Sequence, residues 1–262
     1  MDYITAEMTP YFSLMFFLIG IVFGSFYNVV AYRLPNGMSL IKPGSHCPNC
    51  NHQLSWYELF PIFSFLLLGG KCKKCKEKIS IYYPLFELLT GVLFSVSFLT
   101  FGFSLQLIYS LILCSTLVIL VNSDIKYMII PDELMLFSSI VIIFIRVIVD
   151  IESFLFYFQD GMILFVILLI LKSICDYIFK KDTLGGGDIK LIGFLGLVLG
   201  FKLGLFTLFL SAFIALPVSL FVLMIKKEKM IPYGPFISVA ALITFFYAEY
   251  FINLFNNIFF IK

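Results

Sequence analysis

Two aspartates at the ends of apolar segments are the residues best suited to chemistry in this chain. Asp124 begins the stretch Asp124-Ile-Lys-Tyr-Met-Ile-Ile-Pro-Asp132, and Asp188 lies within Gly185-Gly-Gly-Asp188-Ile-Lys-Leu191. A carboxylate at the end of a membrane span is costly to place there, so it is a functional candidate. Two carboxylates within about 3 Å cannot both ionise readily, so one keeps a proton and the other acts as a base toward a shared water. Such a pair has the chemistry of an aspartic protease, in which the water attacks a peptide carbonyl.

Three glycines, Gly185, Gly186 and Gly187, precede Asp188. Glycine permits positive φ angles and the close approach of another backbone. We therefore expect an extended substrate to lie against these three residues.

Asp132 has a simpler structural interpretation. An acid that follows Pro131 in the first turn of a helix is favoured by the helix dipole. We therefore rank Asp132 below Asp124 as a catalytic candidate.

The composition predicts an integral membrane protein. Hydrophobic residues make up 61% of the chain and charged residues only 13%, whereas a soluble domain has about 25% charged residues. The net charge of +2 is too small to indicate a nucleic-acid partner. A membrane-spanning helix needs about 20 apolar residues, and the chain has eight candidate segments: 11–32, 82–101, 105–122, 132–149, 157–179, 188–201, 203–225 and 233–255. We predict an all-α polytopic bundle of about eight transmembrane helices.

The sixth segment is short and rich in glycine, with Gly193, Gly196 and Gly200. Small residues at this spacing allow close contact between helices in a membrane. We expect the segment to pack tightly against a neighbour and to be broken or partly cytoplasmic.

Basic residues gather on one side of the predicted spans. The loops on that side contain Arg33, Lys42, Lys71, Lys73, Lys74, Lys76, Lys78, Lys126, Lys180, Lys181, Lys190, Lys226, Lys227 and Lys229. The opposite side has only Arg146, Lys202 and Lys262. The positive-inside rule then predicts that both termini lie outside and that residues 33–81 are cytoplasmic. Asp124 and Asp188 both fall at the cytoplasmic boundary.

The polar segment 33–81 contains two Cys-x-x-Cys pairs, Cys47-Pro-Asn-Cys50 and Cys72-Lys-Lys-Cys75. Two such pairs suit tetrahedral zinc, and four protein ligands leave no open position for catalysis. We therefore predict a small zinc-binding cytoplasmic insertion with a structural Zn²⁺. The alternative is four free or disulfide-bonded cysteines, and a cytoplasmic location argues against disulfides.

An ordered set of motifs runs through nearly the whole chain. It comprises Gly24-Ser-Phe-Tyr-Asn28-Val-Val-Ala-Tyr-Arg33-Leu-Pro35, the four-cysteine segment, Trp56-Tyr-Glu-Leu-Phe-Pro61, Ile79-Ser-Ile-Tyr-Tyr-Pro84-Leu-Phe-Glu87-Leu-Leu-Thr-Gly91, Asp124 with Ile130-Pro131-Asp132, Gly185-x-Gly187-Asp188, and Ile231-Pro-Tyr-Gly234-Pro235-Phe236. With these motifs the chain resembles the type IV prepilin peptidases, the bifunctional leader peptidase/N-methyltransferases.

The resemblance implies an activity and a location. Such an enzyme cuts the leader of type IV prepilins or pseudopilins at the cytoplasmic face of the bacterial plasma membrane, with Asp124 and Asp188 as the catalytic pair. It then methylates the new N-terminal amine with S-adenosyl-L-methionine. The implied division is a first transmembrane helix (1–32), a methyltransferase-associated, zinc-binding segment with four cysteines (33–81) and a transmembrane aspartic peptidase core (82–262).

Three polar residues at the cytoplasmic ends of spans, Asn28, Arg33 and Glu87, are candidates for the methyl transfer or for binding its cofactor. Each has a structural alternative: hydrogen bonding at a helix end for Asn28, interfacial anchoring for Arg33 and a buried polar bridge for Glu87.

Other functions remain open from the sequence. The chain could be a peptidase only. It could also be a transporter or channel that uses Asp124 and Asp188 as ion sites, although both acids lie at one face and no inverted repeat is visible. A zinc-ribbon scaffold would explain the cysteines but not the glycines before Asp188.

Overall fold

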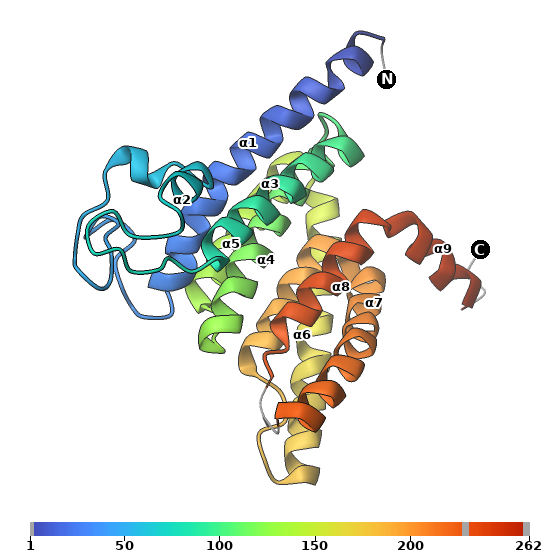
Figure 1. Cartoon of the computed structure of the whole chain (residues 1–262). Coiled ribbons are helices and arrows are strands. Elements are labelled where there is room, and N and C mark those ends of the chain that lie inside the picture. The colour runs from blue at the N-terminus through green and yellow to red at the C-terminus, as the bar shows by residue number, and fades with distance from the viewer. Residues whose placement is uncertain (1–2, 227–230, 259–262) are drawn as a thin grey trace. The chain divides into compact units, whose positions relative to one another are not determined.

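The structure is a computed structural model that describes residues 3–226 and 231–258. Lys227, Lys229 and Lys262, which contributed to the predicted orientation, lie outside these residues. The described chain is helical apart from turns and two isolated β-bridges in the polar segment. Its helices are α1 (Tyr3–Arg33), η1 (Trp56–Leu59), α2 (Phe63–Leu67), α3 (Tyr82–Phe101), α4 (Leu105–Tyr127), α5 (Asp132–Val149), α6 (Ile151–Phe179), α7 (Gly186–Lys226), α8 (Gly234–Phe246) and α9 (Ala248–Ile258) (Figure 1).

Several of these helices can cross a membrane. In the described part of the chain, α1, α3, α4, α6 and α7 are long and apolar enough, and the bent pair α8 and α9 would make a sixth span. Helix α5 has the necessary 18 residues but carries Asp132, Glu133 and Arg146. The all-helical, polytopic architecture is confirmed, whereas the predicted count of eight spans is not.

Contacts divide the chain into two compact units, residues 1–123 and 124–262. In the first unit α1 and α3 pack along each other (Figure 1). A Cβ atom on Gly20 would lie 2.7 Å from the Thr90 carbonyl oxygen, and one on Gly91 would lie 3.0 Å from the Phe17 carbonyl oxygen. The small residues thus let the two backbones approach closely, as in other membrane helix pairs.

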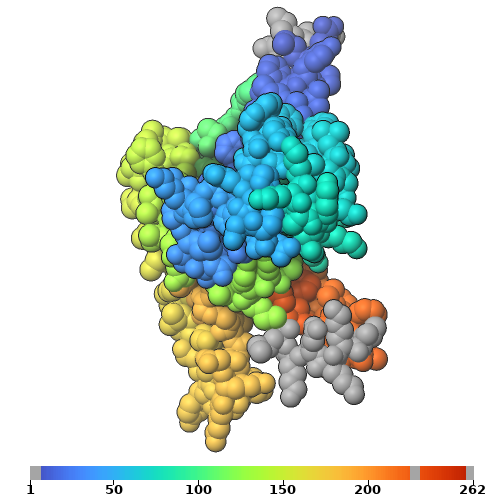
Figure 2. Space-filling view, turned by 60° about the vertical axis from the view of Figure 1, so that its left-hand side comes forward, coloured from blue at the N-terminus to red at the C-terminus, as the bar shows by residue number. Residues whose placement is uncertain are grey.

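The polar segment after α1 also belongs to the first unit. Figure 2 shows it in light blue to cyan as a lobe from which the N-terminal part of α1 projects. It begins where α1 ends and finishes where α3 begins, so both of its ends are attached to helices that pack together.

In the second unit α7 folds back on itself. Gly200 has φ 80° and ψ 174°, which interrupts the helix. A Cβ atom on Gly204 would lie 4.0 Å from the Cα atom of Gly196, whereas eight residues of straight helix span about 12 Å. Helix α7 is therefore two antiparallel arms, 186–199 and 201–226, which match the predicted segments 188–201 and 203–225 (Figure 1).

Two buried charged side chains satisfy the backbone at this break. Arg146 donates from Nε to the Leu197 carbonyl and from Nη2 to the Val198 carbonyl, both at 3.0 Å. Asp160 Oδ2 accepts the Phe201 N–H at 2.9 Å. The carbonyls that end the first arm and an N–H that begins the second thus find partners, which helix ends require.

The glycines of the first arm pack against α6 as expected. A Cβ atom on Gly196 would lie 2.6 Å from the Gly161 Cα atom, and one on Gly161 would lie 2.9 Å from the Gly193 carbonyl oxygen. Helix α7 therefore lies directly on α6, and Asp188 at its N-terminal end is held by this packing.

The predicted span 233–255 is not one straight helix. Helices α8 and α9 meet at an angle of 87° around Tyr247. The ring of Phe206 packs against Phe251 and Phe255 of α9, and Lys202 Nζ donates to Asn256 Oδ1 at 3.0 Å. These contacts with the second arm of α7 favour the bend. They join residues far apart in the sequence, so the hydropathy of 233–255 alone could not predict them.

Candidate active site

Asp124 is a buried carboxylate near the C-terminal end of α4, at the start of the second unit. Its side chain is 5% exposed, and Oδ2 accepts the backbone N–H of Gly234 at 3.0 Å. Gly234 is the first residue of α8. The N-terminus of a helix presents free N–H groups and the positive end of the helix dipole, so it is a favourable neighbour for a carboxylate.

Asp188 lies in the first turn of α7 and is half-buried. Its N–H donates to the Gly185 carbonyl at 3.1 Å, which closes the turn before the helix. A Cβ atom on Gly185 would lie 2.8 Å from Asp188 Oδ2, so a larger residue there would press on the carboxylate. The glycine therefore leaves room for the acid.

The second unit brings the two aspartate motifs together. A Cβ atom on Gly187 would lie 2.8 Å from the Cβ atom of Ile130, so the first turn of α7 touches the chain before α5. Asp124 is near enough to Asp188 for their charges to interact, and Asp188 is near enough to Tyr233. The segments that carry Asp124 and Asp188 thus come together in the second unit, and the catalytic role of the two acids stays a prediction.

The three glycines differ in their surroundings. None of them has a positive φ angle, since the positive-φ glycines of the described chain lie elsewhere. Gly187 lies against Ile130, and Gly185 is exposed, with only the Asp188 carboxylate close to the position of a Cβ atom. A Cβ atom on Gly186 would meet nothing within 4 Å, so only Gly186 faces open space.

Asp132 occupies the predicted position in the first turn of α5. Its side chain is exposed and accepts a hydrogen bond from Lys190 Nζ at 2.6 Å. Asp132 and Lys190 thereby link the start of α5 to the start of α7, two residues beyond Asp188. The ion pair supports the arrangement of the two motifs, and Asp132 keeps its lower rank.

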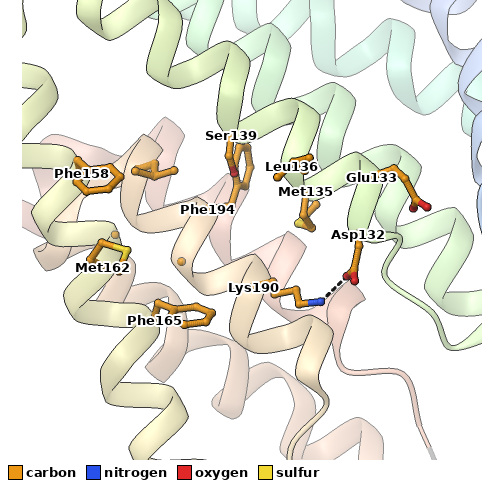
Figure 3. A pocket seen from close by; sticks show the side chains of 13 residues that line it. Asp132, Glu133, Met135, Leu136, Ser139, Phe158, Met162, Phe165, Lys190 and Phe194 are labelled. Atoms are coloured by element: carbon orange, nitrogen blue, oxygen red, sulfur yellow. Dashed lines mark hydrogen bonds and ion pairs between the residues drawn. The ribbon is translucent and has the colours of Figure 1, made fainter.

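A pocket of about 500 Å³ lies between α5, α6 and α7. Figure 3 shows the Asp132–Lys190 pair at one end and Phe158, Met162 and Phe165 at the other. The α7 residues that line the pocket are Lys190, Gly193, Phe194 and Leu197, which share one face of the helix. Asp188 precedes Lys190 by two residues and therefore lies on the opposite face. The pocket is therefore separate from the carboxylate pair, and we assign it no part in hydrolysis.

The late motif supplies groups that the sequence did not assign to the site. Besides the Gly234 N–H, the Tyr233 hydroxyl lies 2.8 Å from Ser211 Oγ and within the field of Asp188. The Gly234 N–H is a backbone group, so no residue type in the sequence predicts it. Only the motif Ile231–Phe236 indicated this part of the site.

The four cysteines of the first unit form one cluster. Their Sγ atoms all lie within 4.8 Å of one another, with Cys47 and Cys75 3.8 Å apart and Cys50 and Cys72 3.9 Å apart. Four sulfurs at about 2.3 Å from a tetrahedral zinc lie about 3.8 Å from one another, so this donor set fits Zn²⁺. The backbone N–H groups of Cys75 and Lys74 lower the pKa of the Cys72 thiol to about 6, which favours the thiolate that zinc binds.

The three methyltransferase candidates are buried and paired within the first unit. Arg33 donates to the carbonyls of Ser39 at 2.8 Å and Pro43 at 2.6 Å. Glu87 Oε2 accepts the Ile62 N–H at 2.8 Å. Both side chains hold the polar segment against the ends of α1 and α3.

Asn28 has partners on two other helices. Its Nδ2 donates to the Tyr83 carbonyl at 3.1 Å, and its Oδ1 accepts from Asn122 at 2.8 Å. The contacts of Asn28 and Glu87 agree with their structural alternatives, whereas Arg33 is buried and bonds backbone carbonyls instead of anchoring at an interface. A direct role in methyl transfer stays a prediction for all three.

The fold and the site together define a polytopic helical membrane protein with a paired-aspartate centre and a four-cysteine segment. Residues 111–220 match the family model "Type IV leader peptidase family", and residues 18–101 match "Bacterial Peptidase A24 N-terminal domain". The chain belongs to the type IV leader peptidase family, as the sequence motifs indicated.

Curated relatives agree with this assignment over most of the chain. The chain is 34% identical to the prepilin leader peptidase/N-methyltransferase of Bacillus subtilis (strain 168), over 91% of this chain and 96% of that protein. It is 32% identical to the protein of the same name from Neisseria gonorrhoeae, over 87% and 88%, and 28% identical to that from Pseudomonas aeruginosa, over 95% and 94%. No solved structure matches the chain.

Proposed function

We propose that this protein cleaves the leader peptide of type IV prepilins or pseudopilins and then methylates the new N-terminal residue. The observation that carries the proposal is the contact of Gly187 with Ile130, which joins the segments that bear Asp124 and Asp188 in the second unit, together with the bond from the N-terminus of α8 to Asp124. Family membership and the names of the curated relatives point to the same reaction.

The geometry supports an aspartic mechanism. Of the two carboxyls, one holds a proton while the other accepts a proton from a water between them, because the two charges repel at short distance. The water attacks the peptide carbonyl, and the protonated carboxyl donates a hydrogen bond to the developing oxyanion. The Gly234 N–H fixes the orientation of the Asp124 carboxylate.

The substrate backbone is proposed to pass beside Gly186, with Gly185 and Gly187 shaping the turn. Open space at Gly186 supports this position, because an extended peptide can approach a residue that has no side chain. The apolar helices around the site suit a substrate that itself lies in the bilayer.

Methyl transfer is proposed for the first unit, with S-adenosyl-L-methionine as the methyl donor. This rests on the name shared by the curated relatives. Asn28, Arg33 and Glu87 remain candidates, and their bonds to the polar segment favour a supporting role at the junction of that segment with α1 and α3. A structural Zn²⁺ on Cys47, Cys50, Cys72 and Cys75 would order the same segment.

We also propose the plasma-membrane orientation predicted above, with both termini outside and the carboxylate pair at the cytoplasmic face. The proposed division is 1–32, 33–81 and 82–262, with eight crossings. The two arms of α7 support this topology, because they place both ends of α7 at the same end of the second unit.

Asparagine substitutions test the peptidase. Asp124→Asn and Asp188→Asn are each expected to abolish cleavage of a co-expressed prepilin, because an amide can neither accept the water's proton nor share one. Asp182→Asn is the matched control, since that side chain is 96% exposed and belongs to neither aspartate motif, and this variant should cleave. Cleavage by Asp124→Asn or Asp188→Asn would contradict the mechanism. A transporter would be favoured if the wild-type protein did not cleave prepilin but carried an ion flux that these two variants lost.

Mass spectrometry of the mature pilin tests the second activity in the same cells. Its N-terminal residue should carry the added mass of one methyl group. An unmodified amine on correctly cleaved pilin would identify the protein as a peptidase only.

A further inference from the structure

A patch of exposed apolar side chains in the polar segment has no part in either proposed reaction. It covers residues 56–67, here called the aromatic turn, which contains η1 and α2. Its exposed apolar residues are Trp56, Tyr57, Leu59, Phe60, Phe63, Leu66 and Leu67. Leu67 is 87% exposed and Trp56 79% exposed, whereas Glu58, the one charged residue in this range, is buried. A contiguous apolar patch of this kind marks an interaction surface.

The aromatic turn is ordered by buried polar contacts. Glu58 Oε2 accepts the Ser55 N–H at 2.9 Å and lies 3.2 Å from His52 Nε2. Ile62 has a φ of 59°, which is rare for a β-branched residue, and its N–H is held by Glu87. The apolar side chains are therefore displayed on a fixed surface.

The contact with Glu87 sets the level of the aromatic turn relative to the membrane. Helix α3 is a membrane-spanning candidate that begins at Tyr82, and Glu87 lies about 7.5 Å along it. The turn thus lies beside the first two turns of a span. Tyr82 and Tyr83 are 56% and 40% exposed at the same level, and tyrosine is enriched where hydrocarbon meets headgroups.

Positive charge follows directly after the aromatic turn. The exposed lysines of the next residues are Lys71, Lys73, Lys74, Lys76 and Lys78, and Glu77 is the only acid among them. Lys73 Nζ donates to the Tyr57 hydroxyl at 2.8 Å, which joins the lysines to the turn. Exposed aromatic side chains beside a basic cluster match a bilayer with anionic headgroups, which attract lysines electrostatically.

We propose that the aromatic turn is an interfacial anchor. Its apolar side chains enter the edge of the bilayer, and the lysines of residues 71–78 bind anionic phospholipid headgroups. The anchor holds the four-cysteine cluster flat against the membrane face from which α1 and α3 emerge. It depends on the membrane-spanning helices and not on the proposed peptidase or methyltransferase activity.

The fluorescence of the full-length protein tests this directly, because Trp56 is the only tryptophan in the chain. The protein is reconstituted into vesicles of phosphatidylcholine and phosphatidylglycerol. Trp56 should emit at short wavelength, lose intensity with lipids brominated high on the acyl chain, and resist quenching by acrylamide. Emission typical of water, quenched by acrylamide and unchanged by brominated lipid, would overturn the proposal.

Two variants and a change of lipid separate the contributions. Leu66→Asp with Leu67→Asp should abolish quenching by brominated lipid, whereas Leu66→Met with Leu67→Met should preserve it. Both sites are exposed, so neither pair disturbs the protein core. Undiminished quenching in the aspartate pair would overturn insertion of the turn. Quenching that does not fall when phosphatidylglycerol is left out would overturn the role of the lysines.

Discussion

The three glycines before Asp188 have different neighbours, although they are identical in sequence. Gly187 lies against Ile130, whereas Gly186 faces open space. A methyl group at Gly187 must push apart the two segments that carry the aspartates, and overpacking of this kind costs about 1–3 kcal/mol. The proposed arrangement of the two aspartates therefore depends on Gly187 more than on Gly186.

We expect Gly187→Ala to lower the rate of prepilin cleavage by about tenfold or more, because each 1.4 kcal/mol of lost transition-state stabilisation costs about tenfold in rate. Gly186→Ala, the matched comparison, adds a methyl group where the substrate is proposed to pass, so it should raise KM and leave kcat near the wild-type value. Rates are measured with purified protein in detergent and a synthetic prepilin. Equal kcat values for the two variants would show that the contact with Ile130 does not position Asp188.

The sequence indicated the two candidate acids, whose catalytic role stays a prediction, but not the groups around them. Asp124 and Asp188 were identifiable because a carboxylate at the end of an apolar run is costly and needs a reason. The Gly234 N–H was not identifiable, because every residue except proline has that donor. The sequence also did not show why a glycine is needed at position 187. Its contact with Ile130 depends on how the first residues of α5 and α7 pack together.

At the scale of the helices, the break at Gly200 determines the direction of the first arm of α7. Gly200 has a φ of 80° and a ψ of 174°, a region that only glycine occupies without strain of about 1–3 kcal/mol. Gly200→Ala should therefore lower the thermal unfolding midpoint of the protein in detergent, whereas Gly186→Ala should leave it unchanged. A wild-type midpoint for Gly200→Ala would mean that α7 tolerates a different path at this residue.

The four-cysteine segment should hold one zinc ion per chain. Cys72→Ser removes a ligand, so metal analysis of the purified protein should find the zinc lost. Cys175→Ser is the matched control because Cys175 lies in α6 and is not one of the four clustered cysteines, so this variant should keep its zinc. Zinc retained by Cys72→Ser, or absent from wild type, would contradict a four-cysteine site.

Element boundaries could be predicted where composition decides them. The limits of α3 agree with the predicted span 82–101, and the glycine-rich sixth segment ends at the break in α7. The bend between α8 and α9 could not be predicted, because 233–255 is continuously apolar. Its cause is the packing of α9 on Phe206, a contact between residues far apart in the chain.

For the whole molecule, the two compact units differ from the division expected from the motifs. The second unit begins at Asp124, near the end of α4, so a single helix belongs to both units. Motifs indicate which residues share an activity, whereas contacts indicate which residues pack together, and the two need not coincide.

The number of membrane crossings depends on how the two ends of the second unit are placed across the bilayer. In the second unit Asp124, Asp188 and Gly234 lie at one end of the helices, and Arg146, Asp160 and Gly200 at the other. If a bilayer surrounds this unit, the hairpin at Gly200 must lie on the membrane side opposite the two carboxylates.

Reporter fusions test this arrangement. Alkaline phosphatase, which is active only outside, should be active after Glu152 and Lys202 and inactive after Lys181. Green fluorescent protein, which folds in the cytoplasm, should give the reverse pattern. The expected pattern follows from the basic loops remaining inside and from the two arms of α7 each crossing the membrane. Phosphatase activity after Lys181 together with fluorescence after Lys202 would reverse the orientation and place the carboxylate pair outside. Fluorescence after both Lys181 and Lys202 would leave the orientation intact but mean that the first arm of α7 does not cross, which would reduce the number of spans below eight.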